Sequence, residues 1–386
     1  MIFNFSKKTF STAILLVIFM QAINAQQSLR PRDYGIKIGV MQPGKMNSIT
    51  DVAGVRVGHT TIIKGDSVRT GVTAIIPSPG NIFQNKIPAA IFSANGFGKL
   101  AGYTQVKELG NLETPIILTN TLAVGTAMNA LIKYSLNLPG NENAQSVNAL
   151  VGETNDSWLN DIRGFHVQES DVFAAIENAR PDEISEGNIG AGTGTMCFGF
   201  KGGIGTASRK LPESLGGYTI GVLVQTNFGG VLQINGVPVG EEMKKFSFSN
   251  QLLNNVDGSC MIVVATDAPL DARNLERLAR RAFLGLGKTG GIASNGSGDY
   301  IIAFSTNNKN TVPHSSENSV LEIDELVNDA ISPLFLAAIE ATEEAIINSL
   351  FAAEDITGKD GRKAIALPVK ETVELMKKYN RIESGK

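Results

Sequence analysis

One short segment constrains this chain more than any other: the turn Asn255–Cys260 and the apolar run Met261–Ala265 that follows it. Within the turn, Asp257 and Gly258 favour a tight reversal, because glycine accepts positive φ and aspartate can bond its own backbone. The apolar run is rich in β-branched residues, which predicts a buried strand. Ser259 therefore lies where a tight turn enters the core, although an ordinary serine after a turn is the simplest interpretation of this segment alone.

The first 25 residues carry the features of a secretory signal peptide. Lys7 and Lys8 supply positive charge, and the apolar run 12–20 is too short to span a bilayer. Residues 23–25 end in a small side chain suited to cleavage, whereas an amphipathic first helix is the alternative. We expect removal of residues 1–25 and a periplasmic or extracellular location. No later stretch is apolar enough to predict a membrane span.

Composition argues against several classes of function. The net charge is −3 with both signs interspersed, so no basic surface for nucleic acid is predicted. The three histidines, His59, His166 and His314, lack the spacing of zinc ligands, and no C-x-x-C occurs, so we expect neither a metal nor another cofactor. Cys197 and Cys260 lie in apolar or glycine-rich surroundings, which favours buried free thiols over a disulfide.

The remaining chain alternates strands and helices unevenly, with the helices grouped in sequence. This order favours layers of helix and sheet over a doubly wound sheet. Gly54 and Gly58 are expected at the turns of a strand pair, and Pro333 is expected to break or kink a long helix. Strands are predicted within 36–40, 49–61, 71–77, 89–94, 115–118, 149–152, 218–226, 261–266 and 300–305, and helices within 121–134, 171–178, 271–286, 323–352 and 371–379.

Polar residues follow two of these predicted strands. The strand 149–152 ends at Glu153–Asp156, and the strand 218–226 is followed by Asn227. Polar groups at strand ends are well placed to form a site. The glycine-rich segment 186–208 lacks the strand–helix context of a dinucleotide-binding motif. Residues 285–289 resemble only the tail of a phosphate-binding loop, so we interpret them as a helix-ending turn.

A serine nucleophile in this chain would need an unusual base. No G-x-S-x-G elbow occurs and the histidines are poorly placed for a Ser-His-Asp set; for His59 we favour a structural hydrogen bond. An α-amino group has a pKa of about 7.7–8.0 and is partly neutral at working pH. If the protein cuts its own Gly258–Ser259 bond, the new Ser259 amine can be that base. The Ser259 hydroxyl would attack the Gly258 carbonyl, where the lack of a side chain limits steric hindrance.

Six segments, in the same order and over nearly all of the chain after the leader, resemble the L-aminopeptidase/D-amidase-esterase and β-peptidyl aminopeptidase family. The resemblance implies an α+β fold, a four-layer αββα sandwich of the N-terminal-nucleophile type, self-cleavage before a serine, and no cofactor. It also implies a larger α subunit, 26–258, and a smaller β subunit, 259–386, which stay together as one domain and often form a tetramer of heterodimers. The segments are ITDVAGVRVGHTT (49–61), VGETNDSWLNDI (151–162), EGNIGAGTGTMCFGFKGGIGTASR (186–209), VLVQTNFG (222–229), GSCMIVVATDAPL (258–270) and SNGSGDYIIAFST (294–306).

The same resemblance implies roles for individual residues. Ser259 matches the nucleophile, and Ser297 matches a second serine that bonds the nucleophile's amine or hydroxyl. Asp299 stands where some members have Glu, so its contact with Ser297 is either direct or through water. Asn227 matches an oxyanion-hole donor, and Asn155 lies where a second polar group near that oxygen is expected, although some members carry Tyr. Turn caps are the structural alternatives for these polar residues.

Together these features predict a periplasmic, self-processing serine aminopeptidase that removes one N-terminal residue from short peptides, amides or esters. That residue would be a β-amino acid, D-Ala or an L-amino acid, and the leader favours the β-peptidyl members. The substrate amine requires an acidic or carbonyl-rich pocket, for which Glu142 in the loop 138–146 is the candidate. The alternatives are an acyltransferase of the ornithine-acetyltransferase type, which would use Thr in place of Ser259, and an uncleaved periplasmic peptide-binding protein.

Overall fold

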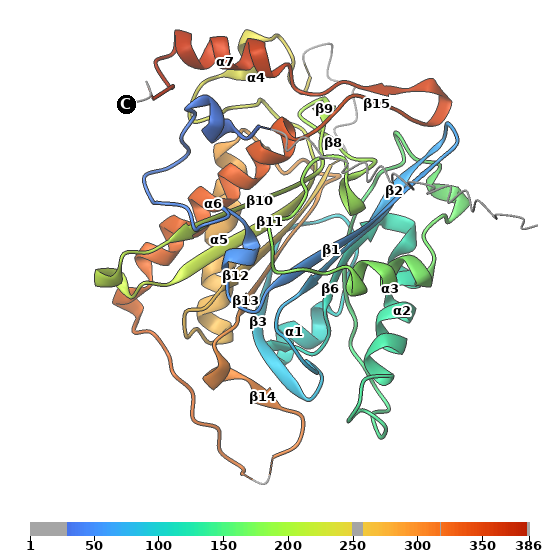
Figure 1. Ribbon diagram of the computed structural model, residues 1–386, viewed down its shortest axis with the longest axis vertical. Helices are drawn as coiled ribbons and strands as arrows, with labels where there is room; N and C mark the ends of the chain where they lie inside the picture. The colour runs from blue at the N-terminus through green and yellow to red at the C-terminus, as the bar shows by residue number, and fades with distance from the viewer. Residues whose placement is uncertain (1–28, 249–257, 317, 384–386) are drawn as a thin grey trace, which may run out of the picture.

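The computed structural model describes residues 29–248, 258–316 and 318–383. The expected signal peptide, 1–25, and residues 255–257 of the predicted turn lie outside them. Within the described residues two β-sheets stack face to face, and helices cover the outer face of each (Figure 1). The predicted α+β fold with four αββα layers is therefore confirmed. None of the helices in these ranges is long and apolar enough to cross a membrane.

The two large sheets differ in strand order. The five-stranded sheet runs β1 (Arg56–Lys64), β2 (Val68–Ile76), β6 (Ile116–Asn120), β7 (Leu150–Thr154) and β4 (Leu100–Ala101). The seven-stranded sheet runs β10 (Ile204–Lys210), β11 (Thr219–Asn227), β12 (Ser259–Thr266), β13 (Gly298–Ser305), β3 (Asn85–Gly96) and β14 (Val312–Pro313), with β5 (Asn111–Leu112) also beside β3. Two small hairpins pair β8 (Met196–Cys197) with β9 (Phe200–Lys201), and β15 (Ile356–Thr357) with β16 (Lys363–Ala364).

Helices form the two outer layers. The long helices α5 and α6 cover β3, β10, β11 and β13, whereas α2 and α3 cover β1, β2, β6 and β7 (Figure 1). Asp271 caps α5 by accepting the Asn274 N–H, as an acidic residue before a helix is expected to do. The helices are α1 (Tyr103–Leu109), α2 (Val124–Leu136), α3 (Glu169–Glu177), α4 (Val239–Glu242), α5 (Ala272–Lys288), α6 (Ser332–Phe351) and α7 (Val369–Lys378).

Strand β12 shows how the sequence builds these layers. Met261 and Val263 pack in the core between the two sheets, while Ile262 and Val264 pack in the core beneath α5 and α6. Successive side chains of a strand point to opposite faces, so a strand covered on both sides must be apolar throughout. Every residue of β12 is buried, and the buried strand predicted from the apolar run is confirmed.

Three local predictions were wrong, each for a physical reason. Gly58 lies inside β1 and not at a turn. Its glycine is explained by packing, because a Cβ there would come within 2.1 Å of the Ala175 carbonyl oxygen of α3. Residues 36–40 form no strand; instead Glu340 of α6 accepts the Val40 N–H at 2.8 Å.

The third concerns the long helix predicted over 323–352. It begins only at Ser332, because Pro333 occupies the first turn of α6, where its missing N–H has no cost. No kink therefore interrupts α6, and the residues before it form only the short 3-10 turn Asn328–Ala330.

Candidate active site

The register of three neighbouring strands brings together residues that are far apart in the sequence. Asn227, the last residue of β11, pairs directly with Ser259, the first residue of β12. Ser259 also pairs with Gly298 of β13, which runs parallel to β12. Ser297 and Asp299 flank Gly298 and so lie at the same level of the sheet. Four predicted site residues therefore gather at adjoining ends of three inner strands of the seven-stranded sheet.

Ser259 lies at a cavity of about 780 Å³ and contacts the peptide group that precedes it. Its hydroxyl donates to the Gly258 carbonyl oxygen at 2.6 Å. The Gly298 N–H donates to the same oxygen at 3.2 Å. Two donors on one carbonyl draw electron density from its carbon and make that carbon more electrophilic. The hydroxyl and a polarised carbonyl thus lie side by side at the bond predicted to be cut.

Packing favours a glycine at position 258. A Cβ at Gly258 would lie 3.0 Å from the Cα and 3.1 Å from the Cβ of Phe228. Phe228 directly follows β11, so a side chain at 258 would require the two strand ends to shift by a few tenths of an ångström. The turn and access to the carbonyl explain this glycine from the sequence; the close approach of Phe228 is a further reason that only the structure shows.

Ser297 and Asp299 form a direct, buried pair. The Ser297 hydroxyl donates to Asp299 Oδ1 at 2.8 Å, and each residue is 1% exposed. Burial raises the pKa of Asp299 to about 6, while hydrogen bonds from Ser297 and from the Cys260 backbone act in the opposite direction. Asp299 Oδ2 is buried and has no hydrogen-bond partner among the described residues. The Asp299 carboxylate therefore contacts the Ser297 hydroxyl directly and not through a water molecule.

This pair lies behind the cavity and does not line it. Asp299 pairs with Cys260, whose side chain belongs to the core beneath α5 and α6. Met261 faces the opposite core, between the sheets, and strand alternation puts the Ser259 side chain on that same side. Asp299, and the Ser297 hydroxyl bonded to it, therefore lie on the opposite face of the sheet from the Ser259 hydroxyl.

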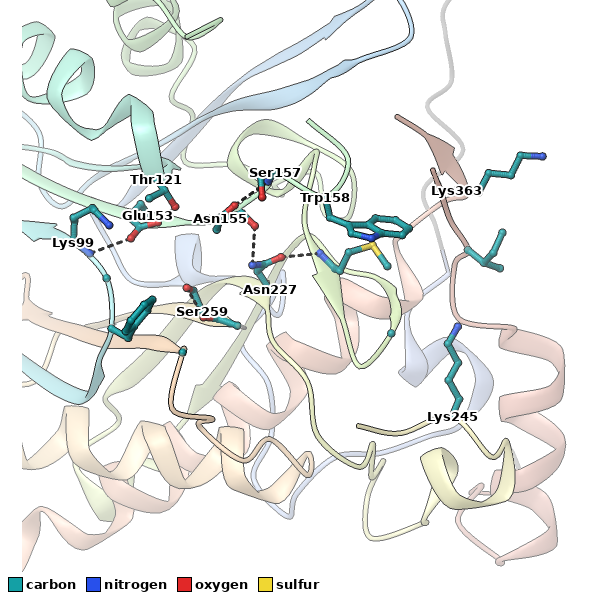
Figure 2. A pocket seen from close by; sticks show the side chains of 17 residues that line it. Lys99, Thr121, Glu153, Asn155, Ser157, Trp158, Asn227, Lys245, Ser259 and Lys363 are labelled. Atoms are coloured by element: carbon teal, nitrogen blue, oxygen red, sulfur yellow. Dashed lines mark hydrogen bonds between the residues drawn. The ribbon is translucent and has the colours of Figure 1, made fainter. Parts of the chain in front are cut away.

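Asn227 is held in one orientation beside Ser259 (Figure 2). Its Oδ1 accepts the Met196 N–H at 3.0 Å, and its Nδ2 donates to the Asn155 carbonyl oxygen at 3.0 Å. Because a side-chain amide carries two N–H donors, one of them remains for a ligand. The arrangement suits Asn227 to stabilise negative charge in the cavity.

The hairpin that holds Asn227 is itself tied by a buried cation. Lys201 is fully buried, and its Nζ donates to the carbonyl oxygens of Gly192 and Gly202 at 2.8 and 2.7 Å. Burial lowers the pKa of Lys201 to about 7. Lys201 pairs with Met196 across the β8–β9 hairpin, so these bonds also fix the N–H that orients Asn227.

Asn155 acts on Asn227 through its backbone carbonyl. Its Oδ1 accepts the Ser157 N–H at 3.0 Å, which closes a local turn, while its carbonyl oxygen anchors Asn227. Asn155 is exposed and lines the cavity; its Oδ1 caps the turn, and its amide N–H groups have no hydrogen-bond partner among the described residues, so both the turn cap and the polar site residue expected from the sequence are compatible with its position.

Glu153 is a cavity residue that belongs to the polar strand end noted in the sequence, although no individual role was predicted for it. It ends β7 of the five-stranded sheet and is the single acidic residue among the described residues that line the cavity. It is 4% exposed, and its carboxylate accepts the Lys99 N–H at 3.0 Å and the Thr121 hydroxyl. The signal that could have identified it is an acidic residue at the end of an apolar strand.

Glu142 is not brought to the site. It is exposed on the loop after α2, where its carboxylate accepts the Gly140 N–H at 3.0 Å, and it does not line the cavity. The reason is the direction of α2: the chain leaves the cavity near Thr121, and 13 helical residues then carry it about 20 Å away.

The remaining titratable residues give no sign of a second centre in the described ranges. No three His, Cys, Asp or Glu side chains converge there as metal ligands would. Cys197 and Cys260 are buried free thiols. Burial lowers the pKa of His59 to about 4, and its Nδ1 lies 2.9 Å from Thr73 Oγ1, which is the structural hydrogen bond favoured from the sequence.

Comparison with known proteins gives a consistent result. Residues 47–364 match Peptidase family S58. The beta-peptidyl aminopeptidase BapA of Sphingosinicella microcystinivorans is 38% identical over 397 residues, which cover 97% of this chain and 98% of that protein. The structure of a Burkholderia sp. beta-aminopeptidase aligns with a TM-score of 0.83 and 40% identity, over 91% of this chain and 99% of that one.

A further structure carries a description of the fold. The L-aminopeptidase D-Ala-esterase/amidase of Ochrobactrum anthropi, described as a prototype of the serine aminopeptidases and a variant of the Ntn hydrolase fold, aligns with a TM-score of 0.84 and 36% identity. The alignment covers 92% of this chain and 99% of that one. The chain therefore belongs to peptidase family S58 and is a serine aminopeptidase with the N-terminal-nucleophile hydrolase fold.

Proposed function

We propose that this aminopeptidase cuts its own Gly258–Ser259 bond and then uses Ser259 to release one N-terminal residue from short peptides, amides or esters. The observation that carries the proposal is the contact between the Ser259 hydroxyl and the Gly258 carbonyl oxygen at 2.6 Å, at the wall of the cavity. Of the substrate types, a β-amino acid at the N-terminus has the best support, because the relatives named beta-peptidyl and beta-aminopeptidase cover nearly the whole chain.

The first reaction is self-cleavage. The Ser259 hydroxyl loses its proton and attacks the Gly258 carbonyl carbon, while the Gly298 N–H, 3.2 Å from the carbonyl oxygen, stabilises the charge that develops there. The C–N bond breaks, the Gly258 acyl group becomes an ester on Ser259, and the Ser259 nitrogen takes up the proton that the hydroxyl has lost. Water then hydrolyses the ester. Residues up to 258 form the α fragment, and Ser259 begins the β fragment.

The second reaction uses the amine that the first one creates. The neutral α-amino group of Ser259, with a reference pKa of about 7.7–8.0, accepts the proton of its own hydroxyl. The hydroxyl oxygen attacks the substrate carbonyl, and the free N–H of the Asn227 amide stabilises the resulting oxyanion. The leaving amine takes the proton, and water deacylates Ser259. Ser297, supported by Asp299 at 2.8 Å, holds the amine through its hydroxyl.

Glu153 supplies the contact that makes the enzyme an aminopeptidase. A free substrate amine is a cation, and a buried carboxylate is the side chain that binds it most strongly. The Lys99 N–H at 3.0 Å and the Thr121 hydroxyl fix the Glu153 carboxylate in place. Glu153 thereby takes the role that the sequence analysis assigned to Glu142.

Location and assembly complete the proposal. The leader of residues 1–25 supports export to the periplasm. The α and β fragments stay together because β11 and β12, which fall on opposite sides of the cut, pair along eight residues from Ile220–Thr266 to Asn227–Ser259. Further assembly, as a tetramer of heterodimers, rests on the family resemblance.

The experiment is a comparison of Ser259→Ala with the wild-type enzyme on a denaturing gel and in a hydrolysis assay. The wild-type chain should run as two bands and hydrolyse a β-alanyl amide, and Ser259→Ala should run as one band without activity. Ser157→Ala is the matched control, since Ser157 lines the same cavity but lends only its N–H to the turn. A Ser259→Ala enzyme that still hydrolysed the amide would disprove the assignment.

A further inference from the structure

The loop that follows β3 joins the two sheets at the cavity. Residues 97–99 of this loop line the cavity. At one end, the Phe97 N–H donates to the Ser297 carbonyl oxygen at 3.2 Å, next to the start of β13. At the other end, the Lys99 N–H donates to Glu153 Oε1 at 3.0 Å, at the end of β7. The loop therefore links the strand beside the nucleophile with the carboxylate proposed to bind the substrate amine.

Gly98 lies between that carboxylate and the strand that pairs with Ser259. A Cβ at Gly98 would be 3.1 Å from Glu153 Oε1, 3.3 Å from Tyr300 Cε2 and 3.4 Å from Gly298 Cα. Because Glu153 Oε1 and Gly298 Cα both lie within 3.4 Å of this one point, they are at most two van der Waals contacts apart. The absence of a side chain at Gly98 therefore lets the carboxylate approach β13 closely.

The short path continues from β13 to the nucleophile. Gly298 pairs directly with Ser259, and neighbouring strands lie about 4.8 Å apart. The Gly298 N–H is 3.2 Å from the Gly258 carbonyl oxygen, which accepts the Ser259 hydroxyl at 2.6 Å. A substrate carbonyl must take a place beside the same hydroxyl to be attacked. The Glu153 carboxylate and the reacting carbonyl are thus separated only by the backbone of Gly98 and Gly298.

The Glu153 carboxylate is restrained on this side of the cavity. Figure 2 shows Lys99, Thr121 and Glu153 together on one side of Ser259. Both carboxylate oxygens of Glu153 are used, since Oε1 accepts the Lys99 N–H and Oε2 accepts the Thr121 hydroxyl. A Cβ at Gly98 would press on Oε1, the same oxygen that bonds the next residue of the loop. An alanine there would therefore displace the carboxylate or break its bond to the Lys99 N–H.

We infer that Gly98 is a positioning residue, which keeps the Glu153 carboxylate close enough to Ser259 to limit the length of the residue that is removed. The inference rests on the proposed function, because it assumes that Glu153 binds the substrate amine. In an α- or β-amino acid, one or two carbons separate the amine from the carbonyl, and such a residue can span the short interval in an extended form. A longer residue must fold back on itself, so its carbonyl is displaced from the nucleophile.

The first test measures this length limit on the self-cleaved wild-type enzyme. The substrates are the anilides of glycine, β-alanine, γ-aminobutyric acid and ε-aminohexanoic acid, which differ only in the number of carbons between amine and carbonyl. From the better of the first two substrates, kcat/KM should fall about tenfold or more at γ-aminobutyryl and further at ε-aminohexanoyl. Equal values for ε-aminohexanoyl and β-alanyl anilide would disprove the length limit and leave the proposed function standing. Hydrolysis of none of the four would contradict the proposed function itself.

The second test assigns the limit to Gly98. It compares the nitrophenyl esters of β-alanine and propionic acid, which differ only in the amine. Gly98→Ala should lower the ratio of β-alanyl to propionyl kcat/KM about tenfold, the scale of one charge-assisted hydrogen bond, whereas a general structural defect would lower both values alike.

Gly96→Ala is the matched control for this variant. Gly96 ends β3, two residues before Gly98, and a Cβ there would meet only Ser93 Oγ, at an ordinary 3.6 Å. It should keep the wild-type ratio of the two esters. A wild-type ratio in Gly98→Ala as well would disprove the positioning role of Gly98, while the binding of the substrate amine by Glu153 would stand.

Discussion

The two sheets contribute different parts of the site. The seven-stranded sheet provides Ser259, Asn227 and the Ser297–Asp299 pair, all at adjoining strand ends. The five-stranded sheet provides Glu153 at the end of β7, whose carboxylate accepts the Lys99 N–H and the Thr121 hydroxyl. In the proposed function this difference becomes a division of roles, in which one sheet carries the bond-changing residues and the other holds the substrate amine. Variants on the first sheet should therefore affect both self-cleavage and hydrolysis, and variants on the second should affect hydrolysis alone.

Among variants that should change catalysis but not the local structure, Asn227→Ala is expected to have the largest effect. Asn227→Ala should lower kcat for hydrolysis by about 10²–10³-fold, because an oxyanion donor is lost. Steady-state kinetics on a β-alanyl amide measure it. Asn155→Ala is the control: its backbone carbonyl, which anchors Asn227, is retained, so only a small loss is expected. Equal losses in the two variants would contradict the role of Asn227.

Glu153 tests the other sheet. Glu153→Gln should lower kcat/KM for a substrate with a free amine by about 10–100-fold, mainly through KM, since a charge-assisted bond is lost. The rate of self-cleavage, followed on gels, should stay at the wild-type value, because the uncut chain has no substrate amine at Glu153. Glu142→Gln should change neither rate. Slower self-cleavage in Glu153→Gln would contradict the proposed division of roles between the two sheets.

The pH profile tests the buried pair on the first sheet. The pKa of Asp299 is raised from 3.8 to about 6, so its carboxylate is charged above about pH 6 and protonated below. Self-cleavage should fall by about tenfold per pH unit below that value, because the Ser297 hydroxyl, which we propose also holds the Ser259 nitrogen as it leaves the Gly258 carbonyl, loses its charged acceptor. Hydrolysis by the cut enzyme should show a further loss near pH 7.7–8.0, where the Ser259 amine takes up a proton.

The variant Asp299→Asn separates these two titrations. It should lower the rate of self-cleavage and remove the step near pH 6, since no carboxyl group is left to titrate. A step near pH 6 that persisted in Asp299→Asn would assign it to another group.

The smallest effect is expected at the cut site itself. Gly258→Ala should slow self-cleavage about fivefold, because a Cβ placed 3.0 Å from Phe228 Cα forces a shift that costs about 1 kcal/mol. Gly236→Ala is the control for substitution at a glycine: nothing lies within 4 Å of its Cβ position, although its φ of +78° makes it strained. Self-cleavage as fast in Gly258→Ala as in the wild type would show that the strand ends tolerate the side chain.

The two sheets also differ in how far the sequence could predict them. The apolar run of β12, the family motifs and the missing histidine base led to Ser259, Asn227, Ser297 and Asp299, which the register of β11 to β13 then brings together. Those residues lie in long motifs next to unambiguous strands. The layers were predictable for the same reason, because alternating and wholly apolar runs define which faces are covered.

The contribution of the five-stranded sheet was harder to predict, because it depends on the direction in which the chain continues after a strand ends. Glu153 and Glu142 are both acidic residues near helix α2, and only the direction of α2 decides which one reaches the cavity. Gly58 and Gly258 likewise owe their identity to backbone from distant segments, Ala175 and Phe228. Such close approaches are tertiary contacts and have no local sequence signal.

The most direct test of the account is the N-terminal sequence and intact mass of the purified wild-type protein. The account predicts two tightly associated fragments, one of which begins at Ser259, in a preparation that hydrolyses a β-alanyl amide. A preparation that hydrolyses the amide as a single chain, with the Gly258–Ser259 bond intact, would contradict it.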